Sequence, residues 1–105
     1  MIIEYGKQYK SSEKKIKRHY NEICILDKIK THIKQCNNYI ELKDHPISKI
    51  YGYEPLKYEL NGYYSFNLCK NGGKIRLIFS IDENNNIVVL EYISNNHYTD
   101  FKNKL

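Results

Sequence analysis

Three side chains in the second half of this 105-residue chain have the types that acid–base chemistry on a phosphodiester requires. Glu54 precedes Pro55, and the proline restricts the backbone so that the carboxylate stands just ahead of a predicted strand. Arg76 is one of two arginines beside 15 lysines, and it lies in an apolar run where a charge needs a partner. Its planar fork suits a phosphate. His97 follows the last apolar run and belongs to the residue type that titrates near neutral pH.

Together these groups meet the needs of RNA cleavage without a metal ion. One group must take the proton of the 2′-hydroxyl, a second must protonate the leaving 5′-oxygen, and a cation must stabilise the phosphorane-like transition state. Each residue also has a structural explanation, which the sequence leaves open. Arg76 can snorkel out of the sheet or pair with a carboxylate such as Glu91, and His97 can be an ordinary loop histidine.

The remaining histidines and the cysteines give no indication of a metal site. No histidine pair has metal-ligand spacing with a carboxylate nearby, and no C-x-x-C pair occurs. The sequence therefore predicts no metal and no other cofactor. Because free cysteines are among the most buried residue types, we expect buried thiols at Cys24, Cys36 and Cys69.

Length and composition predict a single domain over residues 1–105, because two cores in so short a chain would each be too small to fold. No stretch approaches the roughly 18 apolar residues of a membrane span. The first residues also lack the apolar run and cleavage site of a secretory signal. We therefore expect a cytoplasmic protein without a membrane partner.

The charge balance favours a polyanionic partner. The net charge is +5, and each phosphate that a basic protein neutralises releases condensed counterions. Eleven tyrosines, with no tryptophan, add side chains that stack on bases or bond to phosphates, although many must be half-buried sheet residues. Charge and composition are therefore compatible with RNA binding but do not establish it.

The first half of the chain has a helical period. Residues 2–9 are predicted as a short strand, and Ser11 and Ser12 are residue types that cap helices. A helical stripe of apolar residues follows, with lysines opposite, and it predicts either one long helix or two helices separated by a break near Asn21. Asn37 and Asn38 are expected to end this helical segment.

The second half has the period of strands. Residues 39–55 are predicted to be mostly connection, because Pro46, Gly52 and Pro55 interrupt them. Asn61-Gly62 predicts a hairpin turn between strands at 56–60 and 63–69. Strands at 74–81 and 87–93 follow, joined by a turn at 82–86. The fold class is therefore α+β, with an N-terminal strand and one long or two helices packed on one face of an antiparallel sheet of three to four C-terminal strands.

These residues also resemble a known family. The stretch 53–98 resembles the RelE/ParE toxin superfamily, and within it the YoeB-like ribosome-dependent mRNA interferases. The shared features are the E-P-L-K segment at 54–57, an L-x-G turn followed by an aromatic pair and a serine at 60–65, the R-L-hydrophobic-aromatic strand at 76–79, and the pair His97-Tyr98. They occur in the same order at similar spacing.

The resemblance implies a RelE-like fold and a toxin of a toxin–antitoxin module that cuts mRNA in the ribosomal A site. The expected partners are the ribosome, mRNA and an acidic antitoxin. The resemblance implies Glu54 as general base, Arg76 as the transition-state cation and His97 as general acid. It further implies Tyr98 as a residue that positions substrate and Lys57 as an RNA-backbone contact. We also expect RNA contacts from Lys70 and Lys74, which flank a glycine-containing turn.

Two departures and two alternatives accompany this interpretation. YoeB-like proteins carry two basic residues where this chain has Phe66 and Asn67, and the tail at 99–105 extends past their His-Tyr end. The first alternative is a ParE-like toxin that inhibits DNA gyrase without nuclease chemistry. ParE-type chains generally lack the His-Tyr pair and the glutamate before Pro-Leu-Lys, which favours the nuclease. The second is a basic RNA-binding module in which Arg76 and His97 are structural.

Overall fold

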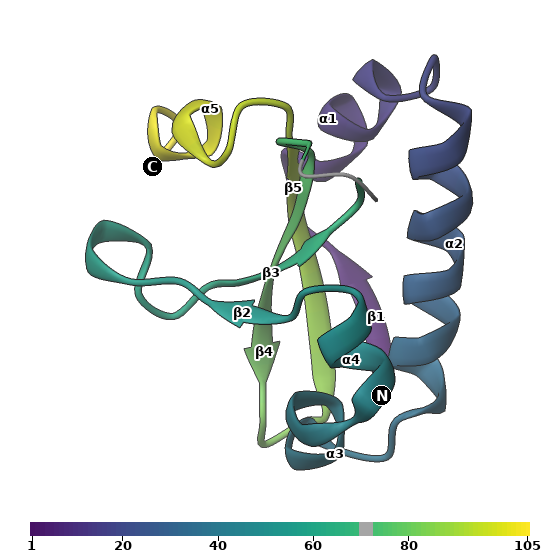
Figure 1. Ribbon diagram of the computed structural model, residues 1–105. Helices are drawn as coiled ribbons and strands as arrows, with labels where there is room; N and C mark the ends of the chain where they lie inside the picture. Colours follow the sequence, from purple (N-terminus) through teal and green to yellow (C-terminus); the bar gives the residue numbers. More distant parts are fainter. Residues whose placement is uncertain (70–72) are drawn as a thin grey trace.

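The fold is built on a five-stranded mixed sheet in the order β1-β5-β4-β3-β2, in a computed structural model that describes residues 1–69 and 73–105 (Figure 1). β1 pairs in parallel with β5, and the other neighbours pair antiparallel. The strands are β1 (Ile2–Tyr5), β2 (Glu54–Pro55), β3 (Tyr64–Asn67), β4 (Arg76–Asp82) and β5 (Ile87–Ser94).

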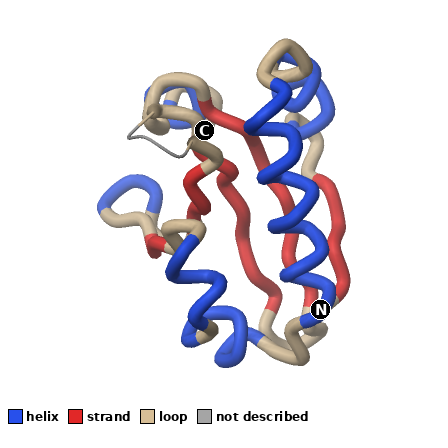
Figure 2. Tube along the Cα trace, turned by 45° about the vertical axis from the view of Figure 1, so that its right-hand side comes forward, coloured by secondary structure: helices blue, strands red, loops and turns tan. Residues whose placement is uncertain are grey.

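The helices lie on both sides of this sheet. The longest, α2, runs along one face of the strands (Figure 2), whereas α5 lies on the side away from α2 (Figure 1). The helices are α1 (Tyr9–Lys15), α2 (Tyr20–Gln35), α3 (Tyr39–Asp44), α4 (Pro46–Ile50) and α5 (Thr99–Lys102).

Two hydrophobic clusters, one on each face, hold the sheet in place. The larger lies under α1 and α2 and contains Ile29, Phe66, Leu77 and Leu90, all fully buried. Burying a side chain of this size contributes about 1.5–3 kcal/mol. The smaller cluster lies on the opposite face and contains Leu56, Leu60, Ile78, Tyr92 and Phe101.

The α+β class and the order of elements are confirmed. The helical segment is divided into α1 and α2, and β4 and β5 occupy the two predicted strand regions with a turn between them. The sheet has four C-terminal strands, β2 to β5, within the predicted three to four, and the N-terminal strand β1 joins them in parallel beside β5.

Three details of the first half were wrong. The first strand ends at Tyr5, and Tyr9 instead begins α1 with its side chain fully buried. Ser12 is not a cap: its buried hydroxyl donates to Tyr9 O and accepts from Ile93 N at 2.9 Å, which ties α1 to β5. Ser11 also lies inside α1 rather than at its cap, whereas the break expected near Asn21 is present just before α2 begins at Tyr20.

The region 39–55 is not a simple connection, because it contains α3, α4 and β2. The Asn38 side chain caps α3 by accepting a bond from Glu41 N at 2.9 Å. His45 caps α4 in the same way, and Pro46 occupies its first turn, where the missing N–H costs nothing. Both helices are too short to show a hydrophobic period, so their polar caps are their clearest sequence signal.

The predicted hairpin at Asn61-Gly62 was also wrong. Residues 56–60 do not pair as a strand; they form a loop that ends in a 3₁₀ turn at Tyr58–Leu60. Leu56 and Leu60 are both buried in the smaller cluster, four residues apart. In a strand, Leu56, Tyr58 and Leu60 would all lie on one face. The 3₁₀ turn instead buries the two leucines and leaves Tyr58 88% exposed.

Cysteine burial follows the prediction at one of three positions. Cys36 is buried, whereas Cys24 and Cys69 are half-buried, and all three are free thiols. Among the described residues, no helix combines the length and the apolar character needed to cross a membrane.

Candidate active site

The pairing register brings several polar residues onto one face of the sheet, the face away from α2. Glu54 lies opposite Ser65 in the β2–β3 pair, and Ser65 lies opposite Ile78 in the β3–β4 pair. Because side chains alternate along a strand, Arg76 shares this face with Ile78. Ser94 in β5 lies opposite Arg76. We call the surface that carries Glu54, Ser65, Arg76 and Ser94 the site face.

A glycine turn sets the position of Glu54. Gly52 follows α4 with a φ of +72°, a left-handed conformation that a residue without Cβ adopts freely. Its N–H donates to Lys49 O at 3.0 Å, which closes the end of α4. Next to it, Asn67 N donates to Tyr51 O at 2.8 Å, so the chain is held against β3 just before β2 begins. The Glu54 carboxylate is therefore exposed at the edge of the sheet.

Tyr98 connects the end of the chain to this edge. Its hydroxyl lies 2.9 Å from Ser65 Oγ and donates to Glu54 Oε2 at 3.5 Å. The His97 ring lies beside the Tyr98 ring, with the two centroids 4.5 Å apart. Residues that stand more than 40 positions apart in the sequence thus meet at one place.

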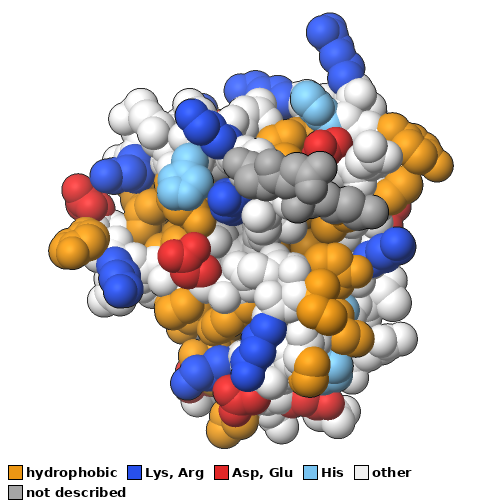
Figure 3. All heavy atoms as spheres, viewed as in Figure 1, with side chains coloured by type: hydrophobic (Ala, Val, Ile, Leu, Met, Phe, Trp, Pro, Cys, Tyr) orange, Lys and Arg blue, Asp and Glu red, His pale blue; other side chains and the backbone are white. Residues whose placement is uncertain are grey.

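An open groove of about 400 Å³ lies between the 54–60 segment and the start of α5. Glu54, Lys57, His97 and Tyr98 all line it, and Lys102 from α5 lines it too. Figure 3 shows acidic, basic and histidine side chains close together on this side of the molecule. With Glu59, the groove contains two carboxylates, an imidazole and two ammonium groups, so it combines candidate acid–base groups with cations that can contact phosphates.

A salt bridge spans part of the groove. Lys102 Nζ lies 3.5 Å from Glu59 Oε1, and both side chains are substantially exposed. A hydrogen bond from its own backbone N–H, and next the charge of Lys102, hold the pKa of Glu59 below its usual range. Glu59 therefore carries its negative charge at neutral pH and offsets part of the positive charge of Lys102.

Arg76 lies on the site face but does not line the described part of the groove. Its Nη1 donates to Gly73 O at 2.6 Å, to Asn67 Oδ1 at 3.1 Å and to Ile75 O at 3.2 Å. All three acceptors are neutral, and within residues 1–69 and 73–105 no carboxylate pairs with the guanidinium. The pairing with Glu91 was wrong, because that carboxylate accepts a hydrogen bond from Ser80 at 2.7 Å. The charge of Arg76 is thus held in place without being neutralised.

The two positions that lack basic residues differ in their surroundings. Phe66 is fully buried in the larger cluster, stacked on Phe79 with ring centroids 5.0 Å apart. Asn67 instead lies on the site face next to Arg76. Of the two positions where the YoeB-like pattern has basic residues, only position 67 therefore affects the charge of the candidate site.

The backbone around His97 joins the site to the start of β4. His97 N donates to Lys74 O at 3.2 Å, and His97 and Tyr98 both have positive φ, +56° and +81°. Lys74 is exposed beside this contact. Lys70, the third lysine predicted to contact RNA, lies outside the described residues.

Two residues of the candidate site were missed in the sequence. Ser65 entered only as part of a motif, yet its hydroxyl meets Tyr98. Lys102 was not a candidate, although it stands four residues after Tyr98, about one helical turn away. The spacing from Tyr98 was the only sequence signal for Lys102. It can be interpreted only when α5 is known to begin at Thr99.

The other histidines have structural surroundings or lie far from the groove. The buried ring of His32 bonds to Ser48 Oγ at 2.7 Å and lies against the ring of His45. Burial, and next the proximity of His45, lowers the pKa of His32. Among the described residues, no group of three His, Cys, Asp or Glu side chains is arranged to hold a metal ion.

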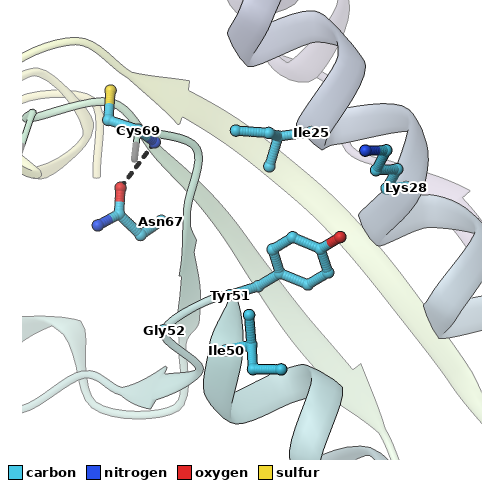
Figure 4. Close-up of a pocket in the computed structure, with 7 residues that line it drawn as sticks. All are labelled: Ile25, Lys28, Ile50, Tyr51, Gly52, Asn67 and Cys69. Carbon is cyan, nitrogen blue, oxygen red and sulfur yellow. Dashed lines mark hydrogen bonds between the residues drawn. The ribbon is translucent and has the colours of Figure 1, made fainter. Parts of the chain in front are cut away.

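A second hollow, of about 290 Å³, lies between α2, α4 and the end of β3 (Figure 4). Asn67 lines it and uses its side-chain oxygen to accept a bond from Cys69 N at 2.8 Å. Lys28 is the only charged residue of its described lining, so this hollow lacks an acid–base pair. It is lined by Ile25, Lys28, Ile50, Tyr51, Gly52, Asn67 and Cys69.

Comparison with known proteins gives matches in structure but none in sequence. No protein-family model matches the chain, and no curated protein sequence matches it. The structure of YafQ from E. coli strain BL21(DE3) matches with a TM-score of 0.65 at 18% identity, over 89% of this chain and 90% of that one.

Two further structures agree with this match. A YoeB/ParE toxin from Agrobacterium tumefaciens matches with a TM-score of 0.59 at 16% identity, over 90% of this chain and 98% of that one. A heterotetrameric YoeB–YefM toxin–antitoxin complex from Staphylococcus aureus matches with a TM-score of 0.56 at 20% identity, over 90% and 94%. The chain is thus structurally similar to the YafQ and YoeB toxins and has the RelE-like fold.

Proposed function

We propose that the protein is the toxin of a type II toxin–antitoxin module and an endoribonuclease that cleaves mRNA in the ribosomal A site. The observation that carries this proposal is the convergence of Glu54, His97 and Tyr98 in one groove, with Arg76 on the same sheet face. The RelE-like fold supports the toxin class, and the residues of the groove support the chemistry.

In the proposed reaction, Glu54 takes the proton of a 2′-hydroxyl, and the 2′-oxygen attacks the adjacent phosphorus. The bond to the 5′-oxygen breaks, and His97 supplies the proton that this leaving oxygen needs. The products are a 2′,3′-cyclic phosphate, which hydrolyses to a 3′-phosphate, and a free 5′-hydroxyl. No metal or other cofactor takes part.

Arg76 and the lysines have electrostatic roles in this proposal. The neutral acceptors around Nη1 hold the guanidinium in place, and Nε and Nη2 have no partner among the described residues. These donors are free to bond to the phosphorane oxygens, on which charge develops in the transition state. Lys57 and Lys102 line the groove and would contact the RNA backbone, and Lys74 would contact it beside His97.

The proposed partner that silences the enzyme is an acidic antitoxin. A net charge of +5 favours an acidic segment over a neutral one. Two of the structurally similar toxins, YoeB and YafQ, were solved in complexes with YefM and DinJ. Co-purification with a small acidic protein encoded beside this one is the expected result, and its absence at moderate salt would count against the partner.

The test is a translation reaction with purified ribosomes and a defined mRNA, in which RNA 5′ ends are mapped after the protein is added. We expect cleavage at in-frame positions, lost in Arg76→Ala and in His97→Ala. Matched controls are Arg18→Ala and His19→Ala, because both residues are exposed between α1 and α2, outside the groove. Both controls should cleave like the native protein.

The alternative is a ParE-like protein that binds DNA gyrase, and the same preparation tests it. Inhibited supercoiling with intact mRNA would replace the nuclease proposal. Cleavage that survives both Arg76→Ala and His97→Ala would keep the nuclease but reject this active site.

A further inference from the structure

Two consecutive residues of the candidate site have a backbone conformation that L-amino acids avoid. The φ angles of His97 and Tyr98 are +56° and +81°. In this left-handed region Cβ crowds the backbone, so a histidine followed by a tyrosine stays there only if the surroundings hold it. Hydrogen bonds from other residues must therefore hold this pair in place.

The Ser94 hydroxyl provides the main bond to this pair. Ser94 is the last residue of β5 and is 0% exposed. Its Oγ accepts from Tyr98 N at 2.9 Å and from Asn96 N at 3.4 Å. A hydroxyl has two acceptor lone pairs and a single donor hydrogen, so both lone pairs are used and the hydrogen remains for another partner.

Asp100 is that partner. Its Oδ1 accepts from Ser94 Oγ and its Oδ2 accepts from Asn95 N at 3.3 Å. The Asn96 side-chain oxygen is a second acceptor, 3.4 Å from Ser94 Oγ, but the Asp100 carboxylate lies closer, so the Ser94 hydrogen is directed mainly at the carboxylate. A bond to an ionised acceptor is stronger than one between neutral groups, which orients the hydroxyl toward Asp100 and its lone pairs toward Tyr98.

The same serine is the neighbour of Arg76 on the adjacent strand. Ser94 lies directly opposite Arg76 in the β4–β5 register, and His97 N bonds to Lys74 O, two residues before Arg76. The positions of the guanidinium, the imidazole and the Tyr98 hydroxyl therefore all depend on this end of the β4–β5 pair.

We propose that Ser94 and Asp100 are positioning residues that hold His97 and Tyr98 in the left-handed conformation and so present both side chains to the groove. This inference rests on the proposed function for its catalytic consequence, but its structural part does not. Asp100 also lies in the first turn of α5, where a carboxylate stabilises a helix. A purely stabilising role changes the folded fraction, whereas a positioning role changes the rate of the folded enzyme.

The test uses Ser94→Ala and Asp100→Ala in the full chain, with Ser80→Ala as the matched control. Ser80 is also a sheet serine that donates to a carboxylate, Glu91, but it lies outside the groove. We expect kcat on ribosomes programmed with a short mRNA to fall about 10- to 100-fold in the two site variants, because small misplacements of reacting groups cost this much. KM should stay within about twofold, since the groove lysines are unchanged, and Ser94→Thr should recover most of the loss.

Amide hydrogen exchange measures the structural part directly. In Ser94→Ala the exchange of the Tyr98 amide should accelerate about tenfold, as expected for local opening, while the Val88 amide in β5 stays unchanged. Unchanged exchange at Tyr98 overturns the inference, and so does a loss of activity that merely follows the unfolded fraction. If Ser94→Ala fails to fold, exchange of the Tyr98 amide is measured in Asp100→Ala instead, with the same expected result and the same overturning result. If the native protein cleaves no RNA, the proposed function fails, and the exchange result still decides the positioning role.

Discussion

The side-chain oxygen of Asn67 accepts a hydrogen bond from Arg76 Nη1 at 3.1 Å, so a neutral amide stands beside the guanidinium. YoeB-like proteins have a basic residue at this position, and the structure indicates what the asparagine does instead. It fixes the arginine without cancelling its charge. On this face the guanidinium of Arg76 is therefore anchored by a neutral side chain.

Asn67→Asp should replace the neutral partner of Arg76 by a charged one. A carboxylate at the same distance would pair with Arg76 and offset the charge meant for the transition state. We expect cleavage to slow about 10- to 100-fold, without loss of thermal stability. Asn84→Asp, in the exposed turn at the other end of β4, adds the same charge and should leave the rate unchanged. Equal slowing in both variants would mean that only net charge matters.

Tyr98→Phe removes the hydroxyl that joins Ser65 to Glu54. The neutral hydrogen bond with Ser65 contributes about 1 kcal/mol, so the fold should persist. The freed Glu54 carboxylate should lose its fixed direction, and kcat should fall by about one order of magnitude. Tyr58→Phe is the matched control, because Tyr58 lines the same groove but is 88% exposed. Native kinetics in Tyr98→Phe would remove Tyr98 from the site.

Glu59→Gln should strengthen RNA binding. The change removes the only carboxylate that pairs with Lys102 among the described residues and leaves the ammonium free for phosphate. The low pKa of Glu59 means that this carboxylate is charged throughout the neutral range. We expect the Kd for a short RNA to fall about two- to fivefold at low salt, and the gain to shrink as salt screens it. Glu83→Gln, in the turn after β4, should give a smaller gain.

His32 should make folding stability depend on pH. Burial lowers its pKa in the native state, whereas the unfolded chain titrates near its usual value of about 6.5. Below this value the unfolded state binds a proton that the native state rejects, so the stability present above about pH 6.5 is lost as the pH falls toward the lowered value. The melting temperature of the native protein should drop between pH 7.5 and pH 5.5.

The variant His32→Gln can still bond to Ser48 and should show a smaller drop over the same pH range. His19→Gln, at an exposed position, should keep the native dependence. Circular dichroism melts of the three proteins provide the comparison. Identical slopes in all of them would assign the effect to other groups.

The predictable parts of the fold are those with a local signal. Strong apolar runs marked β4 and β5, and the apolar stripe with lysines opposite marked α2. The loop at 56–60 was missed because Leu56 and Leu60 pack on Phe101, a contact with a residue 40 positions away. An Asn-Gly turn beside alternating residues gives the same local pattern whether or not such a contact exists.

The residues of the candidate site also divide into those with a local sequence signal and those without one. Glu54, Arg76, His97 and Tyr98 could be named from residue types and resemblance, and the structure brings three of them to one groove. Ser65, Ser94 and Lys102 could not, because their roles follow from strand register and from the start of α5. A serine at the end of a strand has no distinctive sequence context.

The parallel pairing of β1 with β5 has a consequence for how the active protein arises. Ile2 pairs with Ile87, so the sheet closes only after a contact between distant parts of the chain has formed. Such non-local pairings delay folding, because the entropy of a long loop is lost before any contact repays it. His97 and Tyr98 directly follow β5, so they are attached to the strand that this non-local pairing completes. Under the proposed function, a newly synthesised chain would therefore lack its complete sheet for a time, and the proposed antitoxin could bind it during that time.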